Sequence, residues 1–156
     1  MNNIQKAYED IEDIVGTKYV TDSDAICYSY SMNCDTVLQG IPDLVVKPNS
    51  SEEISEILKV ANRYKIKVIP RGGGADLTGG AKPIGDGGIV VDITRMNKVL
   101  DVDEENHIVT AECGISWSEL CEHLRKVGIG YYTGSTGPGS GFSATIGGGL
   151  SNNTLG

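Results

Sequence analysis

The feature that most constrains this chain is a glycine-rich segment at residues 70–80, PRGGGADLTGG, which directly follows the β-like run Val68-Ile69. Glycine is needed where the backbone takes a positive φ or approaches another group too closely for a Cβ. Successive N–H groups in such a loop can point into one concavity that suits phosphate oxygens. Arg71 adds a cation with a fork of donors. The segment therefore indicates a loop that cradles a phosphate or pyrophosphate, and a flexible surface turn is the alternative.

Length and charge narrow the class of protein. The chain has 156 residues, enough for one domain, and carries a net charge of −8. This charge excludes nucleic acid and anionic lipid as expected partners. The first residues lack the basic start and apolar run of a signal peptide, and no stretch is long enough to span a membrane. We therefore expect a cytoplasmic protein, with its four cysteines as free thiols and no metal site.

Hydrophobic spacing predicts an alternation of helices and strands. Helices are expected at residues 4–15, from Ser50 to about Tyr64 and after Ser116, and strands at residues 44–46, 67–69, 88–93, 99–102 and 108–113. Ser50 with Glu53, and Ser116 with Glu119, have the spacing of capping boxes. Residues 17–43 are expected to be irregular. The strand at 44–46, its helix and the strand at 67–69 predict a right-handed parallel unit, which the glycine segment follows.

A second glycine-rich region ends the chain. No Asp, Glu, Lys or Arg follows Lys126, and 18 of the 21 glycines fall in residues 72–88 or 128–156. A flexible linker is one interpretation. Phe142, Ile146 and Leu150 argue against it, because a solvated linker does not need them. We therefore expect a segment that lies inside a larger protein, of which this chain is the N-terminal part.

Common phosphate-binding motifs do not fit. Gly74 leads to Gly79-Gly80-Ala81, so the Walker A pattern fails, and the first loop lacks the Rossmann spacing. Residues 139–144 do match GxGxxA, but the glycines at 147–149 are expected to break the helix that this motif must open. His107 and His123 are expected on the surface, and the carboxylates form no obvious catalytic pair.

The two loops are more specific together than either is alone. The sequence resembles a flavoprotein domain in the order and spacing of its motifs. These motifs are PRGGG, L and GG at 70–80, VVDITRMN at 90–97, AECG at 111–114, PGS at 138–140 and ATIGG at 144–148. The sequence is similar to the PCMH-type FAD-binding domain of the vanillyl-alcohol oxidase/p-cresol methylhydroxylase family, and most of all to the glycolate oxidase and D-lactate dehydrogenase branch. The resemblance runs from about Pro42 to Gly156, so residues 1–41 are expected to form a helical and irregular lead-in.

The resemblance implies an α+β fold that comprises the first subdomain and the start of the second subdomain of the two-subdomain FAD-binding fold. It places the FAD pyrophosphate between these subdomains. The implied cofactor-binding residues are Arg71, Gly72, Gly73, Gly74, Ala75, Asp76, Leu77, Pro138, Gly139, Ser140, Ala144, Thr145, Ile146, Gly147 and Gly148. The first loop holds no histidine, so a non-covalent FAD is expected. Asp76 would stand beside the pyrophosphate and must point away from it.

The implied function is the FAD-binding part of a flavin-dependent oxidoreductase that oxidises a 2-hydroxy acid such as glycolate or D-lactate. The chain alone is expected to be inactive, because the substrate domain and the catalytic residues of the family have no counterparts in it. Expected partners are FAD, the rest of the flavoprotein in the same or a separate chain, and a second copy of this chain. The alternative is a stand-alone nucleotide-binding or assembly module without catalysis.

Overall fold

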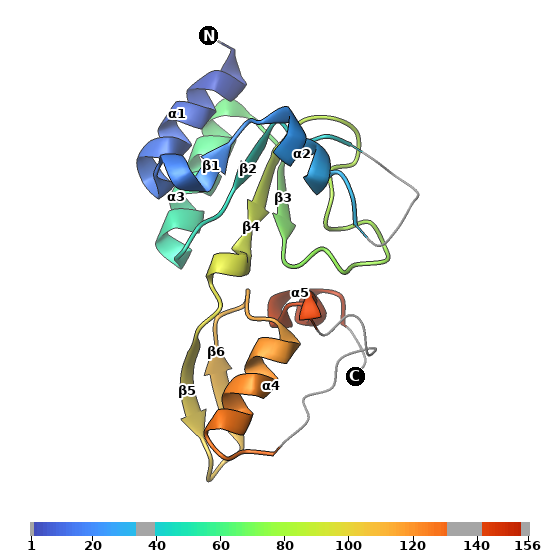
Figure 1. The fold of residues 1–156 in the computed structure, drawn as a ribbon. Helices are drawn as coiled ribbons and strands as arrows, with labels where there is room; N and C mark the ends of the chain where they lie inside the picture. Colours follow the sequence, from blue (N-terminus) through green and yellow to red (C-terminus); the bar gives the residue numbers. More distant parts are fainter. Residues whose placement is uncertain (1, 34–39, 131–141, 154–156) are drawn as a thin grey trace.

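The structure, a computed structural model, describes residues 2–33, 40–130 and 142–153. A four-stranded sheet with three helices forms the upper part of the view in Figure 1, and a two-stranded ribbon with two further helices forms the lower part. The helices are α1 (Asn3–Val15), α2 (Asp24–Tyr30), α3 (Ser51–Tyr64), α4 (Trp117–Lys126) and α5 (Ile146–Ser151). The strands are β1 (Val20–Thr21), β2 (Leu44–Val46), β3 (Val68–Arg71), β4 (Ile89–Asp92), β5 (Val99–Asp103) and β6 (Ile108–Ala111). The short 3-10 helices are η1 (Thr17–Tyr19) and η2 (Ile93–Arg95). The α+β prediction is confirmed.

The larger sheet has the strand order β1-β2-β4-β3. β4 lies between β2 and β3 and runs parallel to both, while β1 is antiparallel to β2. Because β2, β3 and β4 are parallel, the segments that follow them leave the sheet at one edge. Arg71 pairs with Asp92 in this register, so the glycine loop and η2 both start at that edge.

The strands of the larger sheet are buried on both faces. Leu44, Val46, Ile89 and Val91 pack against α1 and α3, whose buried residues include Ile11 and Ile57. The intervening Val45, Ile69 and Val90 pack on the opposite face with Cys27 of α2. This alternation explains the continuous apolar runs of the strands, as expected for a parallel sheet covered on both sides.

Helix ends follow the local sequence. The Ser116 side chain accepts from the Glu119 N–H at 3.2 Å, and Glu119 accepts from the Ser116 N–H at 2.8 Å, so this capping box is confirmed. The box at Ser50 is only half formed. The Ser50 side chain accepts from the Glu53 N–H, but the Glu53 carboxylate accepts from the Asn49 N–H and not from the Ser50 N–H. Within the described residues, no helix is long and apolar enough to cross a membrane.

Two local predictions were wrong. Residues 24–30 form α2 where an irregular stretch was expected, because burial of Cys27 against the sheet stabilises a helix too short to show a periodic pattern. The spacing of Leu120, Cys121, Leu124 and Val127 predicts that all four line the buried face of α4, but Val127 is 49% exposed. It lies just past the end of that helix, where the backbone turns at Gly128.

Candidate functional site

The first glycine segment is a loop of bends between β3 and the region before β4, which confirms that part of the prediction. Gly74 and Gly79 have φ values of +70° and +83°, which residues with a side chain rarely adopt. β3 reaches Arg71, two residues further than expected, so the loop starts from a strand end held by backbone pairing to β4. The loop therefore has a rigid entry and, at Gly74 and Gly79, a backbone conformation that favours glycine.

The second region folds back onto this loop at two glycines. A Cβ on Gly73 would overlap the Ser143 carbonyl, and one on Gly72 would overlap the Thr145 hydroxyl. The backbones of the two segments thus approach more closely than any side chain allows. These two contacts bring together loops that are 70 residues apart in the sequence.

Backbone bonds fix the second region to the start of α4. Trp117 N–H donates to the Ala144 carbonyl at 3.2 Å, and Ile146 N–H donates to the Ile115 carbonyl at 3.0 Å. Gly147 N–H donates to the Cys113 carbonyl at 2.9 Å. The position of residues 144–147 is therefore set by the segment that links β6 to α4.

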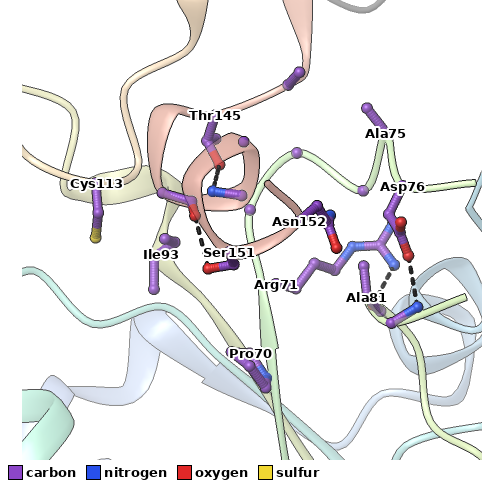
Figure 2. A pocket seen from close by; sticks show the side chains of 18 of the residues that line it. Pro70, Arg71, Ala75, Asp76, Ala81, Ile93, Cys113, Thr145, Ser151 and Asn152 are labelled. Atoms are coloured by element: carbon purple, nitrogen blue, oxygen red, sulfur yellow. Dashed lines mark hydrogen bonds between the residues drawn. The ribbon is translucent and has the colours of Figure 1, made fainter. Parts of the chain in front are cut away.

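The glycines at 147–149 lie inside α5, so the expectation that they break a helix there was wrong. The Thr145 side chain caps this helix by accepting from the Gly148 N–H at 3.3 Å (Figure 2). A Cβ on Gly147 would meet the Cβ and carbonyl of Cys113 at 2.9 Å, and a Cβ on Gly149 would lie 3.3 Å from the Trp117 ring. Tertiary packing that requires glycine outweighs the low helix propensity of these residues.

A cavity of about 560 Å³ lies where the two loops meet. Its wall includes eleven of the fifteen residues predicted to bind the cofactor: Arg71, Gly72, Gly73, Gly74, Ala75, Asp76, Leu77, Ala144, Thr145, Gly147 and Gly148. Ile146 is not in this wall, because its side chain packs against the cluster of Ile115, Leu120 and Leu124. Pro138, Gly139 and Ser140 lie outside the described residues.

Sequence reasoning missed several residues of the wall. They are Pro70, Thr78, Gly80, Ala81, Ile93, Cys113, Trp117, Gly149, Ser151 and Asn152. Ile93 could have been found, because it directly follows β4 at the edge where the glycine loop follows β3. Cys113 and Trp117 could not, because their place in the wall depends on the backbone bonds that fold residues 144–147 onto them.

Arg71 contacts backbone carbonyls at the cavity wall. Its guanidinium donates to the carbonyl oxygens of Met32 at 2.9 Å, Ala81 at 3.0 Å and Tyr30 at 3.4 Å. It also lies over the Tyr30 ring, 5.1 Å from the centroid. Figure 2 shows its bond to Ala81 beside the Asp76 side chain. The cation is thus part of the wall, with several of its donors used to hold neighbouring segments.

Asp76 organises its own loop. Its carboxylate accepts from the Thr78 N–H at 3.1 Å, the Thr78 hydroxyl at 2.8 Å and the Gly80 N–H at 2.5 Å. Partial burial would raise the pKa of this group, but these hydrogen bonds outweigh it and hold the pKa below the ordinary value. The carboxylate is therefore directed toward residues 78–80, as expected if it must avoid an anion.

The charge of the wall differs from that of the whole chain. Among the described wall residues, Arg71 and Asp76 are the only charged ones, whereas the chain carries −8. A second cavity of about 400 Å³ shares Gly73 and Thr145 with the first but is lined by Glu119 and Glu122. The first cavity therefore repels an anionic ligand less than the second cavity does. In the part of the chain described here, no cluster of three metal-ligating side chains occurs.

Comparison with known proteins gives consistent matches. A family model described as an FAD binding domain matches residues 42–156. Over 148 residues the chain is 32% identical to the glycolate oxidase subunit GlcD of Bacillus subtilis, covering 95% of this chain and 31% of that protein. Over 115 residues it is 37% identical to a D-lactate dehydrogenase of Anaerostipes hadrus, covering 74% of this chain and 23% of that protein.

Solved structures agree on the fold. An alkyldihydroxyacetonephosphate synthase structure matches with a TM-score of 0.80 and 26% identity, covering 94% of this chain and 31% of that chain. A p-cresol methylhydroxylase structure matches with a TM-score of 0.75 and 20% identity, covering 81% of this chain and 25% of that chain. The chain thus spans about a third or less of the length of these relatives.

Proposed function

The chain belongs to the FAD-binding domain family, and on that premise we propose that it is the cofactor-binding part of a flavin-dependent oxidoreductase. We further propose that the whole enzyme oxidises a 2-hydroxy acid such as glycolate or D-lactate. The names of the glycolate oxidase subunit and the D-lactate dehydrogenase support this substrate class. Because the chain covers less than a third of either protein, the residues that bind the substrate belong to a further domain in the same or a separate chain.

The observation that carries the proposal is the meeting of the two glycine loops at one cavity. Gly72 and Gly73 lie against Thr145 and Ser143, at positions where a Cβ would prevent the contact. The wall is nearly neutral and rich in backbone, which suits a pyrophosphate, and its volume of about 560 Å³ is within the usual range for cofactor sites. The residues present therefore fit FAD.

In this proposal the first loop holds the pyrophosphate through its backbone N–H groups. Gly72, Gly73 and Gly74 supply donors without side chains in the way, and Arg71 lowers the local negative potential. Ala144, Thr145, Gly147 and Gly148 form the facing wall, with Pro138, Gly139 and Ser140 as part of the same second loop. FAD held by these residues would supply the hydride acceptor for the oxidation of the hydroxyl-bearing carbon of the substrate. The residues of this chain bind and orient the cofactor and transfer no proton themselves.

Three further points belong to the proposal. The FAD is non-covalent, because residues 70–80 contain no histidine to attach it. The protein works in the cytoplasm, a reducing compartment that suits the free thiols of Cys27 and Cys113. Its partners are the chain or domain that carries the substrate site and a second copy of this chain, since Phe142 and Leu150 are 80% and 77% exposed.

A titration followed by NMR tests the site. FAD should shift the backbone amide signals of residues 72–76 and 144–148 in a saturable way, while riboflavin, which lacks the pyrophosphate, should shift the first loop far less. Equal shifts with ADP and FAD would favour the alternative of a nucleotide-binding module without catalysis. Absence of shifts in both loops at saturating FAD would contradict the proposed site.

The substrate class is tested in the complete enzyme. Glycolate or D-lactate should reduce the bound flavin and an added dye, while a phenol should not. Reduction by the phenol alone would overturn the substrate assignment and leave the FAD site intact.

A further inference from the structure

Residues 30–33 lie before the matched family region, which begins at residue 42, yet they contact the first glycine loop. We propose that they act as a clamp that sets the conformation of this loop, with Arg71 and Asn33 as positioning residues. The clamp consists of the Tyr30 and Met32 carbonyls, the Asn33 side chain and the Arg71 guanidinium. Its importance for cofactor binding rests on the proposed function, whereas its effect on the loop does not.

Arg71 joins three segments in one fork of donors. It belongs to β3, and it donates to Tyr30 and Met32 on one side and to Ala81, beyond the glycine loop, on the other. A planar guanidinium with fixed donor directions can hold these carbonyls together. A lysine ammonium, with a compact charge on a flexible stem, cannot span them in the same way. The close approach of Gly74 to the Arg71 side chain adds to this arrangement, since a Cβ there would overlap the guanidinium.

Asn33 acts at the middle of the loop. Its side-chain amide donates to the Asp76 carbonyl oxygen at 3.0 Å. The Asp76 carboxylate in turn accepts from the Thr78 and Gly80 N–H groups. Asn33 thus holds the backbone of the residue that orders residues 78–80. The clamp therefore touches the loop at its entry through Arg71, at its centre through Asp76 and at its exit through Ala81.

Tyr30 anchors the clamp to the sheet. Its hydroxyl donates to the Asp92 carboxylate at 2.5 Å, and the Lys47 ammonium lies 3.2 Å from the same oxygen. Asp92 ends β4, and Lys47 follows β2, so these contacts tie Tyr30 to the ends of two strands next to the site. The Tyr30 ring also faces the Arg71 guanidinium. The clamp is therefore fixed to the rigid part of the fold.

Amide hydrogen exchange of the chain without ligand tests the clamp. Asn33→Ala removes one hydrogen bond to the loop, so the Thr78 and Gly80 amides should exchange about fivefold faster. Arg71→Lys keeps the charge but loses the fork, so it should raise the same rates at least as much. The matched control is Asn3→Ala, which removes a similar bond, from the Asn3 side chain to the Tyr64 carbonyl, far from the loop. In all three variants the β4 amides should exchange as in the wild type.

The outcomes separate the clamp from the proposed function. Unchanged exchange at Thr78 and Gly80 in Asn33→Ala, or wild-type exchange in Arg71→Lys, would overturn the clamp. Adding FAD to the wild type should slow exchange at the same amides if the proposed site is right. Faster exchange in the variants without any protection by FAD would support the clamp and reject the FAD site. Protection by FAD in the wild type, with wild-type exchange rates in the variants, would support the FAD site and reject the clamp.

Discussion

At the scale of single residues, Gly73 decides whether the two loops can meet. A side chain there would overlap the Ser143 carbonyl, which belongs to the backbone and cannot rotate away. A Cβ on Gly72 would meet the side chain of Thr145, which is buried and caps α5. Substitution at Gly73 should therefore separate the loops, while substitution at Gly72 should displace the cap of α5.

We predict that Gly73→Ala lowers the free energy of unfolding by about 1–3 kcal/mol, the usual cost of overpacking. Gly130→Ala is the matched control, because a Cβ at Gly130 meets no atom of residues 2–33, 40–130 or 142–153 within 4 Å. Urea denaturation of both variants measures the difference. In the complete enzyme Gly73→Val should lower the flavin-to-protein ratio more than Arg71→Ala does. Equal stability of Gly73→Ala and Gly130→Ala would contradict the close contact.

Asp92 is the most strongly buried carboxylate near the site, with 4% of its surface exposed. Burial alone would raise the pKa of this group. Hydrogen bonds from the Thr94 side chain, the Tyr30 hydroxyl and the Thr94 N–H, together with the Lys47 ammonium, outweigh burial and hold the pKa below 3.8. A carboxyl group with a lowered pKa stabilises the fold above its unfolded pKa, and this contribution is lost as the pH falls through its folded pKa.

We therefore predict that Asp92→Asn is less stable than the wild type at pH 7 by about 1.5–3 kcal/mol, the usual worth of a hydrogen bond to a charged group. The difference should narrow as the pH falls below the ordinary pKa of an Asp carboxyl group and through the lowered pKa of folded Asp92, where the wild-type carboxylate takes up a proton. Urea denaturation at a series of pH values measures both curves. A difference that stays constant down to acid unfolding would show that the charge of Asp92 contributes nothing.

At the scale of elements, α5 depends on its surroundings. It has six residues, of which three are consecutive glycines, and a helix this short does not form alone. Each glycine costs about 1 kcal/mol relative to alanine in a helix. The Thr145 cap and the bond from Gly147 N–H to Cys113 offset this cost. The helix is thus a product of packing against the segment between β6 and α4.

Alanine substitutions in α5 should distinguish the effect of helix propensity on stability from the effect of tertiary packing. Both Gly147→Ala and Gly149→Ala gain about 1 kcal/mol of helix propensity. The new Cβ at Gly147 would lie 2.9 Å from the Cys113 carbonyl, whereas at Gly149 it meets the Trp117 ring at 3.3 Å. We expect Gly147→Ala to be destabilised by about 1 kcal/mol and Gly149→Ala to be near neutral. The reverse order of their urea midpoints would show that propensity decides the stability of α5.

The elements that could be predicted from the sequence are those with a strong periodic pattern or a local cap. α1, α3 and α4 show their apolar faces, α3 and α4 also show their caps Ser50 and Ser116, and β2 was predicted at its observed bounds. α2 and α5 could not be predicted, because tertiary contacts stabilise them. The glycine loops of the candidate site were visible as glycine patterns. Their contact at Gly73 was not visible in the sequence, since it is made by Ser143, which lies 70 residues later in the chain.

At the scale of the whole molecule, large apolar side chains at or near the two cavities are exposed. Leu77, Phe142 and Leu150 are exposed by 74%, 80% and 77%. Leu77 lies in the wall of the first cavity, and Phe142 in that of the second. Such exposure of large apolar residues around a site is typical of a surface that another domain or chain covers. In the proposed function, the site of this chain would therefore supply only part of the contacts that FAD needs.

We predict that the chain alone binds FAD with a Kd of ~1 mM and reduces no dye with D-lactate or glycolate. Four donors to the pyrophosphate contribute about 6–12 kcal/mol in total. Association costs at least about 4 kcal/mol, and ordering each additional residue about 1–2 kcal/mol. With mid-range values of about 9 kcal/mol gained, about 4 kcal/mol lost on association and about 1 kcal/mol lost on ordering one residue, about 4 kcal/mol remains, which corresponds to the stated Kd. Calorimetry and a dye-reduction assay measure both quantities, and submicromolar affinity or any turnover would show a self-sufficient module.

One property of the cavity wall makes it directly observable. Trp117 is the only tryptophan of the chain, and its half-buried indole belongs to that wall, next to Gly149. Light emitted by tryptophan therefore originates at the site and nowhere else in the protein. An isoalloxazine ring absorbs in the range where indole emits, so a flavin held in the cavity would quench this emission by energy transfer. The protein carries its own optical reporter of occupancy, without any label.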